Sequence, residues 1–239
     1  PEALIRSYGE LGVEVIHAWG MTETYDSAIA TYIKSYLAGE SGAEIKLRKK
    51  QGLPFPCIEV DLIDESGRRQ PWDGKSVGEL IIRGAWVIDG YYERPDSGKE
   101  SHIDGWFRTG DVVTIDPEGY VEVVDRLKDL IRSGGEWISS VELENAIMGH
   151  PAVREAAVVG LKHPRWGERP LALVALKEGH NLSKEELKNY LSKRFPRFWL
   201  PDEVVFVEHI PKTSVGKFDK KLIRQSYGNL YLQRDAGKL

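Results

Sequence analysis

The sequence predicts an α+β protein with a β-rich first part and a second part of mixed helices and strands. Between residues 55 and 125, short runs of β-forming residues alternate with turn sequences, which is typical of a small antiparallel sheet or barrel. Further along, residues 183–186 (Ser-Lys-Glu-Glu) form a capping box in front of an amphipathic helix. The pattern changes near residues 125–128, so we expect a domain boundary there.

The first part opens with three predicted elements. Residues 13–17 have the pattern of a short strand that runs into Trp19-Gly-Met-Thr-Glu23. Apolar residues recur at helical spacing over 28–37, which predicts an amphipathic helix that ends at Gly39. Residues 39–52 are rich in Gly, Lys and Glu and indicate a loop. The strands of the β-rich stretch are expected at 58–63, 77–83, 112–115 and 120–124, with turns at 64–67 and 116–119.

The second part alternates helices and strands. Ser139 or Ser140 can cap a helix that ends at Gly149. The remaining elements are expected as strands at 153–161, 171–176 and 204–207, a helix from Ser183 to about 195, a loop at 211–217 and a terminal helix at 219–227.

The composition excludes several classes of protein. Of the 239 residues, 41% are hydrophobic and 29% charged, as in ordinary globular proteins, and a formal net charge of −4 argues against a nucleic-acid binder. Cys57 is the only cysteine, so an internal disulfide and a thiolate zinc site are excluded. With no signal peptide and no apolar run near the ~20 residues of a membrane helix, we expect a cytoplasmic protein without a transmembrane segment.

Three segments carry groups suited to chemistry. Gly20-Met-Thr-Glu23 lies between a predicted strand and a predicted helix, so backbone N–H groups at the helix N-terminus can bind an anion while Glu23 holds a hard cation. The alternative is that Thr22 only caps the helix. Asp111 ends the segment that begins at Trp106 and stands at the predicted start of a strand. There its carboxylate can accept hydrogen bonds from the two hydroxyls of a ribose, or from its own backbone N–H groups. Lys217 follows a glycine at the end of the segment 211–217. This segment is not a Walker A loop, because Pro211 occupies the position of the first Gly in that motif and Phe218 occupies the position of its Ser or Thr. On its own, Lys217 is also compatible with a solvated surface lysine.

Five motifs in register resemble the adenylate-forming superfamily, which includes acyl-CoA synthetases, firefly luciferase and the adenylation domains of peptide synthetases. They are Trp19 to Glu23, Gly78-Glu-Leu80 with Gly90-Tyr-Tyr92, Trp106 to Asp111, Asp125-Arg-Leu-Lys-Asp129, and Pro211 to Lys217. They extend over nearly the whole chain, so the resemblance outweighs the simpler interpretation of each segment taken alone.

The resemblance implies roles in nucleotide binding for the first part. Thr22 and Glu23 would face the ATP phosphates, with Glu23 holding Mg²⁺. Trp19, Gly20 and Met21 would line the adenine and acyl site. Asp111 would accept the ribose hydroxyls, with Arg126 nearby.

The resemblance also implies domain alternation, with 1–125 as the end of a large AMP-binding domain, 126–128 as the hinge and 129–239 as a small mobile domain. Lys128 would be the pivot, and Lys217 would be the catalytic lysine of adenylation. Gly134 and Gly135 would approach the pantetheine arm of CoA, unless they form a simple strand-to-helix turn.

The sequence departs from the family in one respect. The Ser/Thr/Gly-rich phosphate-binding loop and most of the N-terminal domain are not in the sequence, so we expect a C-terminal fragment that folds but does not form acyl-adenylate alone. The resemblance is greatest to medium- and long-chain fatty-acid–CoA ligases, which use ATP, a carboxylic acid and CoA. The alternatives are an adenylation domain that loads a carrier protein and a non-catalytic nucleotide-binding module, and a homodimer is left open.

Overall fold

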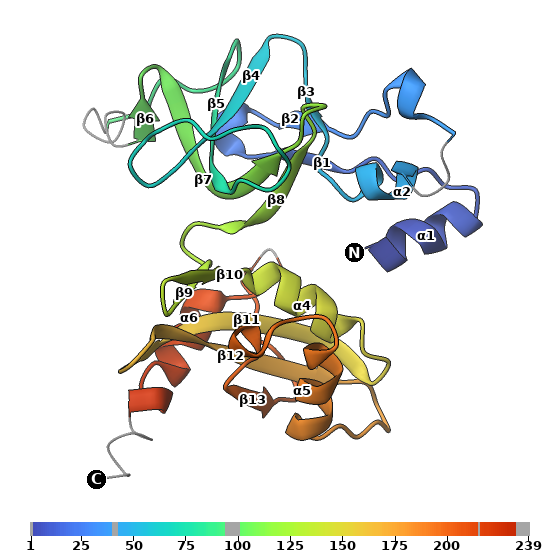
Figure 1. Ribbon diagram of the computed structural model, residues 1–239, viewed down its shortest axis with the longest axis vertical. Helices are drawn as coiled ribbons and strands as arrows, with labels where there is room; N and C mark the ends of the chain where they lie inside the picture. Colours follow the sequence, from blue (N-terminus) through green and yellow to red (C-terminus); the bar gives the residue numbers. More distant parts are fainter. Residues whose placement is uncertain (1, 40–42, 94–100, 215, 233–239) are drawn as a thin grey trace. The chain divides into compact units, whose positions relative to one another are not determined.

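The computed structural model describes residues 2–39, 43–93, 101–214 and 216–232 (Figure 1). The chain divides into two compact units, residues 1–127 and 128–239. Each unit encloses buried hydrophobic residues of its own.

A five-stranded antiparallel sheet is the centre of the first unit (Figure 1). Its strands pair in the order β4-β5-β7-β6, with β8 also paired to β7. The strands are β4 (Ile58–Ile63), β5 (Gly78–Gly84), β6 (His102–Ile103), β7 (Trp106–Ile115) and β8 (Val121–Arg126). The antiparallel arrangement predicted for this stretch is confirmed. The strand predicted at 112–115 is longer and begins at Trp106, so Asp111 lies inside β7 and not at its start.

A second sheet of three strands contains β1 (Ala18–Gly20), β2 (Ser27–Ala30) and β3 (Leu53–Pro54). The helix predicted over 28–37 is wrong, because Ala28 and Ile29 are fully buried in β2 while Tyr36 is exposed. A short apolar run fits a buried strand as well as a buried helix, and pairing with β1 and β3 on either side selects the strand.

Other predictions for the first unit also need correction. Residues 13–17 do not form a strand, because Val13 and Ile16 are exposed and pairing begins only at Ala18. The loop predicted at 39–52 contains helix α2 (Ala43–Arg48), in which Arg48 pairs with Glu44 at 2.6 Å. The unit also contains helix α1 (Glu2–Glu10) and the 3₁₀ turns Thr22–Thr24 and Ser35–Leu37.

The second unit is built on another five-stranded sheet, in the order β10-β9-β12-β11 with β13 parallel to β12. Its strands are β9 (Ile131–Ser133), β10 (Glu136–Ile138), β11 (Val153–His163), β12 (Gly167–Leu176) and β13 (Glu203–Phe206). Its helices are α4 (Ser140–Met148), α5 (Lys184–Ser192) and α6 (Lys220–Tyr227), with a 3₁₀ turn at Arg197–Trp199. The β9–β10 hairpin and the 3₁₀ turn at Arg197–Trp199 were not predicted from the sequence.

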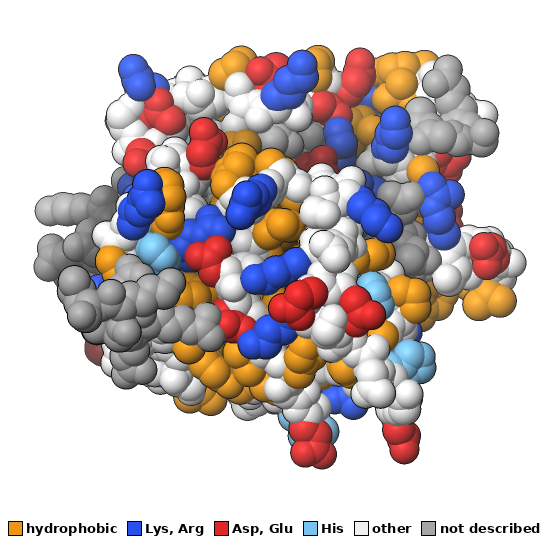
Figure 2. All heavy atoms as spheres, turned by 60° about the horizontal axis from the view of Figure 1, so that its bottom comes forward, with side chains coloured by type: hydrophobic (Ala, Val, Ile, Leu, Met, Phe, Trp, Pro, Cys, Tyr) orange, Lys and Arg blue, Asp and Glu red, His pale blue; other side chains and the backbone are white. Residues whose placement is uncertain are grey.

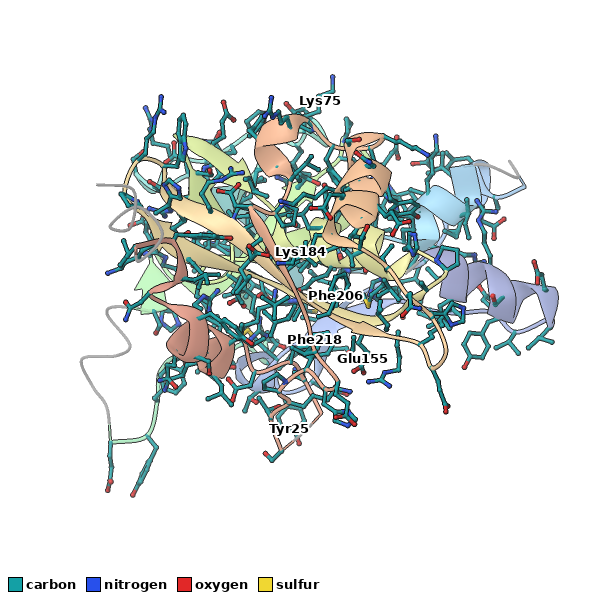
Figure 3. All side chains as sticks on the ribbon, turned by 90° about the horizontal axis from the view of Figure 1, so that it is seen from below. Tyr25, Lys75, Glu155, Lys184, Phe206 and Phe218 are labelled. Atoms are coloured by element: carbon teal, nitrogen blue, oxygen red, sulfur yellow. The ribbon has the colours of Figure 1, made fainter. Side chains whose placement is uncertain are left out.

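Successive side chains of β11 point to opposite faces of this sheet, and helices pack against both faces. Ala156 and Val158 belong to a core with α4 and α5, whereas Ala157 and Val159 belong to a core with Ile223 of α6. Two predicted caps are confirmed: Ser139 accepts from the N–H of Glu142 at 3.1 Å, and Ser183 forms a reciprocal capping box with Glu186. Lys184, labelled in Figure 3, pairs with the buried Glu203 at the start of β13.

On the face shown in Figure 2, basic and acidic side chains are interspersed with hydrophobic ones. This distribution agrees with the nearly balanced counts of 33 basic and 37 acidic residues. None of the described helices is long and apolar enough to cross a membrane.

Candidate functional site

A buried carboxylate, that of Asp111, lies at the centre of the candidate site in the first unit. The indole N–H of Trp19 donates to Oδ2 of Asp111 at 2.8 Å, and Nε of Arg126 lies 3.2 Å from Oδ1. Asp111 is only 7% exposed. Burial raises the pKa of its carboxyl above the ordinary value, although the Trp19 hydrogen bond and the Arg126 charge oppose that shift. The structure thus brings together Trp19, Asp111 and Arg126, three of the residues named in the sequence analysis.

Glu79 supports the backbone directly before Asp111. Its buried carboxylate accepts the N–H of Gly110 at 3.2 Å and Nε of Arg108 at 3.0 Å. On the other side of β7, Asp111 is in register with Arg126 of β8. Glu79 lies in one of the five motifs but had no role assigned from the sequence, and its hydrogen bonds show that it holds β7 in place.

Gly20 is required by close packing between β1 and the segment before β2. A Cβ atom at this position would lie 1.9 Å from the carbonyl oxygen of Asp26, so only glycine fits. Its neighbours Trp19 and Met21 both pack against the hydrophobic core of the unit. Gly20 and Met21 therefore shape the backbone around Trp19.

Among the described residues around Glu23, no α-helix begins: Thr22–Thr24 form a single 3₁₀ turn, and strand β2 follows. This turn is too short to provide the anion site that a helix N-terminus would offer, so that part of the prediction is wrong. Thr22 is exposed, and the half-buried Glu23 accepts a hydrogen bond from the hydroxyl of Tyr91 at 2.7 Å. Burial and the Glu23 carboxylate raise the pKa of Tyr91 to about 12, so this hydroxyl is a neutral donor at ordinary pH.

Lys217 lies in a tight loop of the second unit. The loop is closed by an N–H of Thr213 bonded to the carbonyl oxygen of Lys217 at 2.7 Å. Two other lysines of this region are paired: Lys212 with Glu155 at 2.5 Å, and Lys220 with Glu144 at 2.7 Å. Lys212 also lies over the ring of Phe218, and Glu155 and Phe218 are labelled in Figure 3. The ammonium group of Lys217 is exposed, and no described residue bonds to it.

The chain passes from one unit to the other at Lys128. In the first unit, the N–H of Leu127 donates to the carbonyl oxygen of Gly110 at 2.8 Å. In the second unit, Arg224 of α6 donates to the carbonyl oxygen of Lys128 at 3.2 Å and to Oδ1 of Asp129 at 2.7 Å. Both sides of the bond between Leu127 and Lys128 are therefore fixed to their own unit.

Gly134 and Gly135 form the turn of the β9–β10 hairpin, so the simple strand-to-helix turn is not what the structure shows. Both have positive φ, +60° and +88°, which this two-residue turn requires. The N–H of Gly134 donates to the carbonyl oxygen of Trp166 at 2.8 Å. The guanidinium of Arg132 lies over the ring of Trp137, and that of Arg165 lies over Trp166.

The buried Arg169 of β12 holds this hairpin through a hydrogen bond to strand β9. Its guanidinium donates to Ser133 Oγ at 2.9 Å and to Asp202 Oδ1 at 2.6 Å, and it is 7% exposed. No role for Arg169 was predicted from the sequence. The signal that could have identified it is a basic residue two positions before the six consecutive apolar residues 171–176 of β12.

Both units match known family models. Residues 1–92 match the AMP-binding enzyme model, and residues 142–217 match the model of the AMP-binding enzyme C-terminal domain. Together with the five motifs, these matches show that the chain belongs to the adenylate-forming, or AMP-binding, enzyme family.

Among curated relatives, the chain is 49% identical to a long-chain-fatty-acid–CoA ligase of Thermus thermophilus and 41% identical to a medium-chain-fatty-acid–CoA ligase of Ectopseudomonas oleovorans. These matches cover 97% and 99% of this chain but 43% of each relative, so the chain spans less than half their length. Among solved structures, ATP-bound MatB from Rhodopseudomonas palustris is similar, with a TM-score of 0.85 and 29% identity over 96% of this chain and 44% of that one.

Proposed function

We propose that this chain is the carboxyl-terminal part of a fatty-acid–CoA ligase. In the first half-reaction, a carboxylate oxygen of the acid attacks the α-phosphorus of ATP, and the bond to pyrophosphate breaks. In the second, the CoA sulfur attacks the acyl carbon of the acyl-adenylate, and AMP leaves with the oxygen. The fatty acid as substrate is inferred from the relatives, which are named as long- and medium-chain ligases.

The observation that carries this proposal is the Asp111 site. The carboxyl group of Asp111 is almost wholly buried, burial raises its pKa, and its position is fixed by Trp19 and Arg126. Buried titratable groups with a shifted pKa and a specific charge partner are typical of functional sites. A carboxylate can accept hydrogen bonds from both hydroxyls of a ribose, so we assign Asp111 to the nucleotide ribose, with Trp19, Gly20 and Met21 shaping the adjacent surface.

Lys217 is proposed as the catalytic lysine of adenylation. The negative charge that develops on the phosphoryl oxygens is stabilised by a fixed cation, and a lysine is a compact one. The ammonium group of Lys217 is exposed and no described residue bonds to it, unlike those of Lys212 and Lys220, so it is available for a substrate. The second unit turns about Lys128 and delivers Lys217 for the first half-reaction only.

Glu23 is proposed to hold the Mg²⁺ that accompanies ATP, next to Thr22. Among the described residues, no group of three or more His, Cys, Asp and Glu side chains could hold a metal ion. Mg²⁺ is commonly bound by one or two carboxylates together with phosphates and water, so the single carboxylate of Glu23 fits this cation. When bound, the cation neutralises phosphate charge.

Gly134 and Gly135 are proposed to contact CoA. Glycines at the tip of a hairpin allow another chain to approach the backbone closely. Trp137 and Trp166, about two-fifths exposed and each stacked with an arginine, flank this turn and offer aromatic and cationic surface to a thiol cofactor that carries phosphates.

The test is to assay the full-length protein for fatty-acid-dependent exchange of pyrophosphate into ATP and for acyl-CoA formation. We expect both activities in the full-length protein and neither in the 239-residue chain alone. A carrier-loading adenylation domain would show exchange without thioester formation on CoA, and a non-catalytic module would show neither activity in the full-length protein. Either result would overturn the proposal.

A further inference from the structure

The side chains of Glu23 and Tyr91 meet although they are 68 residues apart in the sequence. The hydroxyl of Tyr91 donates to Oε1 of Glu23 at 2.7 Å. The same segments meet a second time, because the N–H of Ile88 donates to the backbone carbonyl oxygen of Glu23 at 3.0 Å. Residue 23 is therefore held at both its backbone and its carboxylate by the segment 88–91.

This segment is itself anchored to the first unit. Val87 and Ile88 pack against the hydrophobic core, and Nε2 of His102 lies 3.1 Å from the carbonyl oxygen of Ile88. Tyr91 is 40% exposed, whereas the adjacent Tyr92 is 90% exposed. Of two neighbouring tyrosines, one is thus directed to a carboxylate and the other projects into solvent.

A neutral donor on one carboxylate oxygen has a specific chemical consequence. It restricts rotation of the carboxylate and leaves its negative charge intact, whereas a lysine or arginine in the same place would neutralise that charge. Among the described residues, the Tyr91 hydroxyl is the single group that bonds the Glu23 side chain, so Oε2 is available to a ligand. Hydrogen bonds from outer groups to metal-binding side chains fix the orientation of those side chains and raise metal affinity.

We propose that Tyr91 is a positioning residue that fixes the Glu23 carboxylate so that Oε2 binds the divalent cation accompanying the nucleotide phosphates. This inference rests on the proposed function, which assigns Glu23 to that cation. Tyr91 acts through Glu23 and has no contact with the reacting atoms.

The experiment compares Tyr91→Phe with the matched control Tyr92→Phe in the full-length protein. Mn²⁺ is the probe, and its binding is followed by electron paramagnetic resonance in the presence of a non-hydrolysable ATP analogue. We expect Tyr91→Phe to weaken Mn²⁺ binding by roughly 10- to 100-fold, the usual effect of losing such an outer hydrogen bond, and Tyr92→Phe to leave it unchanged. The Mg²⁺ concentration for half-maximal adenylation should rise by the same factor, with the rate recovered at saturating Mg²⁺.

A merely structural role for Tyr91 predicts a different result: a lower melting temperature and a reduced rate that Mg²⁺ does not restore. Glu23→Gln separates this inference from the proposed function. If Glu23→Gln weakens Mn²⁺ binding and Tyr91→Phe does not, the role of Tyr91 is overturned while that of Glu23 stands. If Glu23→Gln has no effect on Mn²⁺ binding, the assignment of Glu23 to the cation fails, and the role of Tyr91 fails with it.

Discussion

The indole N–H of Trp19 and the carboxylate of Asp111 form a 2.8 Å hydrogen bond that joins the small three-stranded sheet to the central strand β7. These residues are 92 positions apart and belong to different motifs of the sequence. The bond shows that two motifs which appear independent in the sequence are parts of one site. It also shows why a tryptophan, which offers a single N–H donor on a large apolar ring, suits position 19.

The raised pKa of Asp111 leads to a prediction about stability. The raised pKa means that the folded state binds the carboxyl proton of Asp111 more tightly than the unfolded state does. Ionisation of Asp111 therefore lowers the stability of the folded state. This destabilisation disappears as the pH falls through the folded-state pKa toward the ordinary Asp value of about 3.9. We therefore expect Asp111→Asn to melt at the same or a higher temperature than the wild type at pH 7.5. The difference should shrink toward pH 4.

The same variant should bind nucleotide poorly. Loss of a hydrogen bond that involves a charged group costs about 1.5–3 kcal/mol, or roughly 10- to 100-fold in affinity for AMP measured by calorimetry on the full-length protein. Asp61→Asn is the control, since Asp61 pairs with Arg69 outside the site. An Asp111→Asn protein that is less stable at neutral pH but binds AMP normally would show that Asp111 has a structural role instead.

The elements that could be predicted from the sequence are those specified by neighbouring residues, and the elements specified by residues distant in the sequence could not be. The strand at 58–63 and the helix caps at Ser139 and Ser183 were predicted correctly because alternation and capping are local patterns. The strand at 27–30 was missed because Ala-Ile-Ala carries no local sign that distinguishes a strand from a helix. Only its pairing with residues 18–20 and 53–54 selects the strand.

In the candidate site, too, residues that lie in motifs could be predicted from the sequence, and a contact between distant segments could not. Trp19, Asp111 and Arg126 were found because each lies in a recognisable motif, and the structure brings them together. The bond between Tyr91 and Glu23 could not be predicted, because it depends on how the segment 88–91 folds back onto residue 23. Tertiary hydrogen bonds between distant loops leave no periodic trace in a single sequence.

Glu79 provides a prediction about the support of β7. In Glu79→Leu, the N–H of Gly110 and the guanidinium of Arg108 lose their acceptor next to a buried strand. We expect a loss of about 1–3 kcal/mol in the free energy of unfolding, measured by urea denaturation. The control Glu59→Leu removes the exposed pair with Arg83 and should cost at most about 1 kcal/mol. Equal losses in the two variants would show that Glu79 is not a buried anchor.

Lys217 and Lys212 form a natural pair of variants in one loop. Lys217→Ala should slow adenylation by roughly 10²- to 10³-fold in the full-length protein, because a fixed cation is lost from the developing phosphoryl charge. Transfer of the acyl group from preformed acyl-adenylate to CoA should largely persist. Lys212→Ala breaks the pair with Glu155 and should change stability by no more than about 1 kcal/mol while sparing adenylation. Equal loss of both half-reactions in Lys217→Ala would refute its assignment to the first.

Gly134 tests the CoA assignment, because strain and contact can be separated there. Gly134 has a φ of +60°, and a Cβ atom would lie 3.1 Å from Cε3 of Trp166. Gly179 has a φ of +72° with no atom within 4 Å of such a Cβ. Alanine in the left-handed region costs roughly 1–2 kcal/mol, so both Gly134→Ala and Gly179→Ala should lower the melting temperature by similar amounts. Only Gly134→Ala also displaces Trp166 beside the hairpin, so only that variant should raise KM for CoA while pyrophosphate exchange remains unchanged. A KM for CoA that changes equally in both variants, or in neither, would exclude the β9–β10 turn from the CoA site.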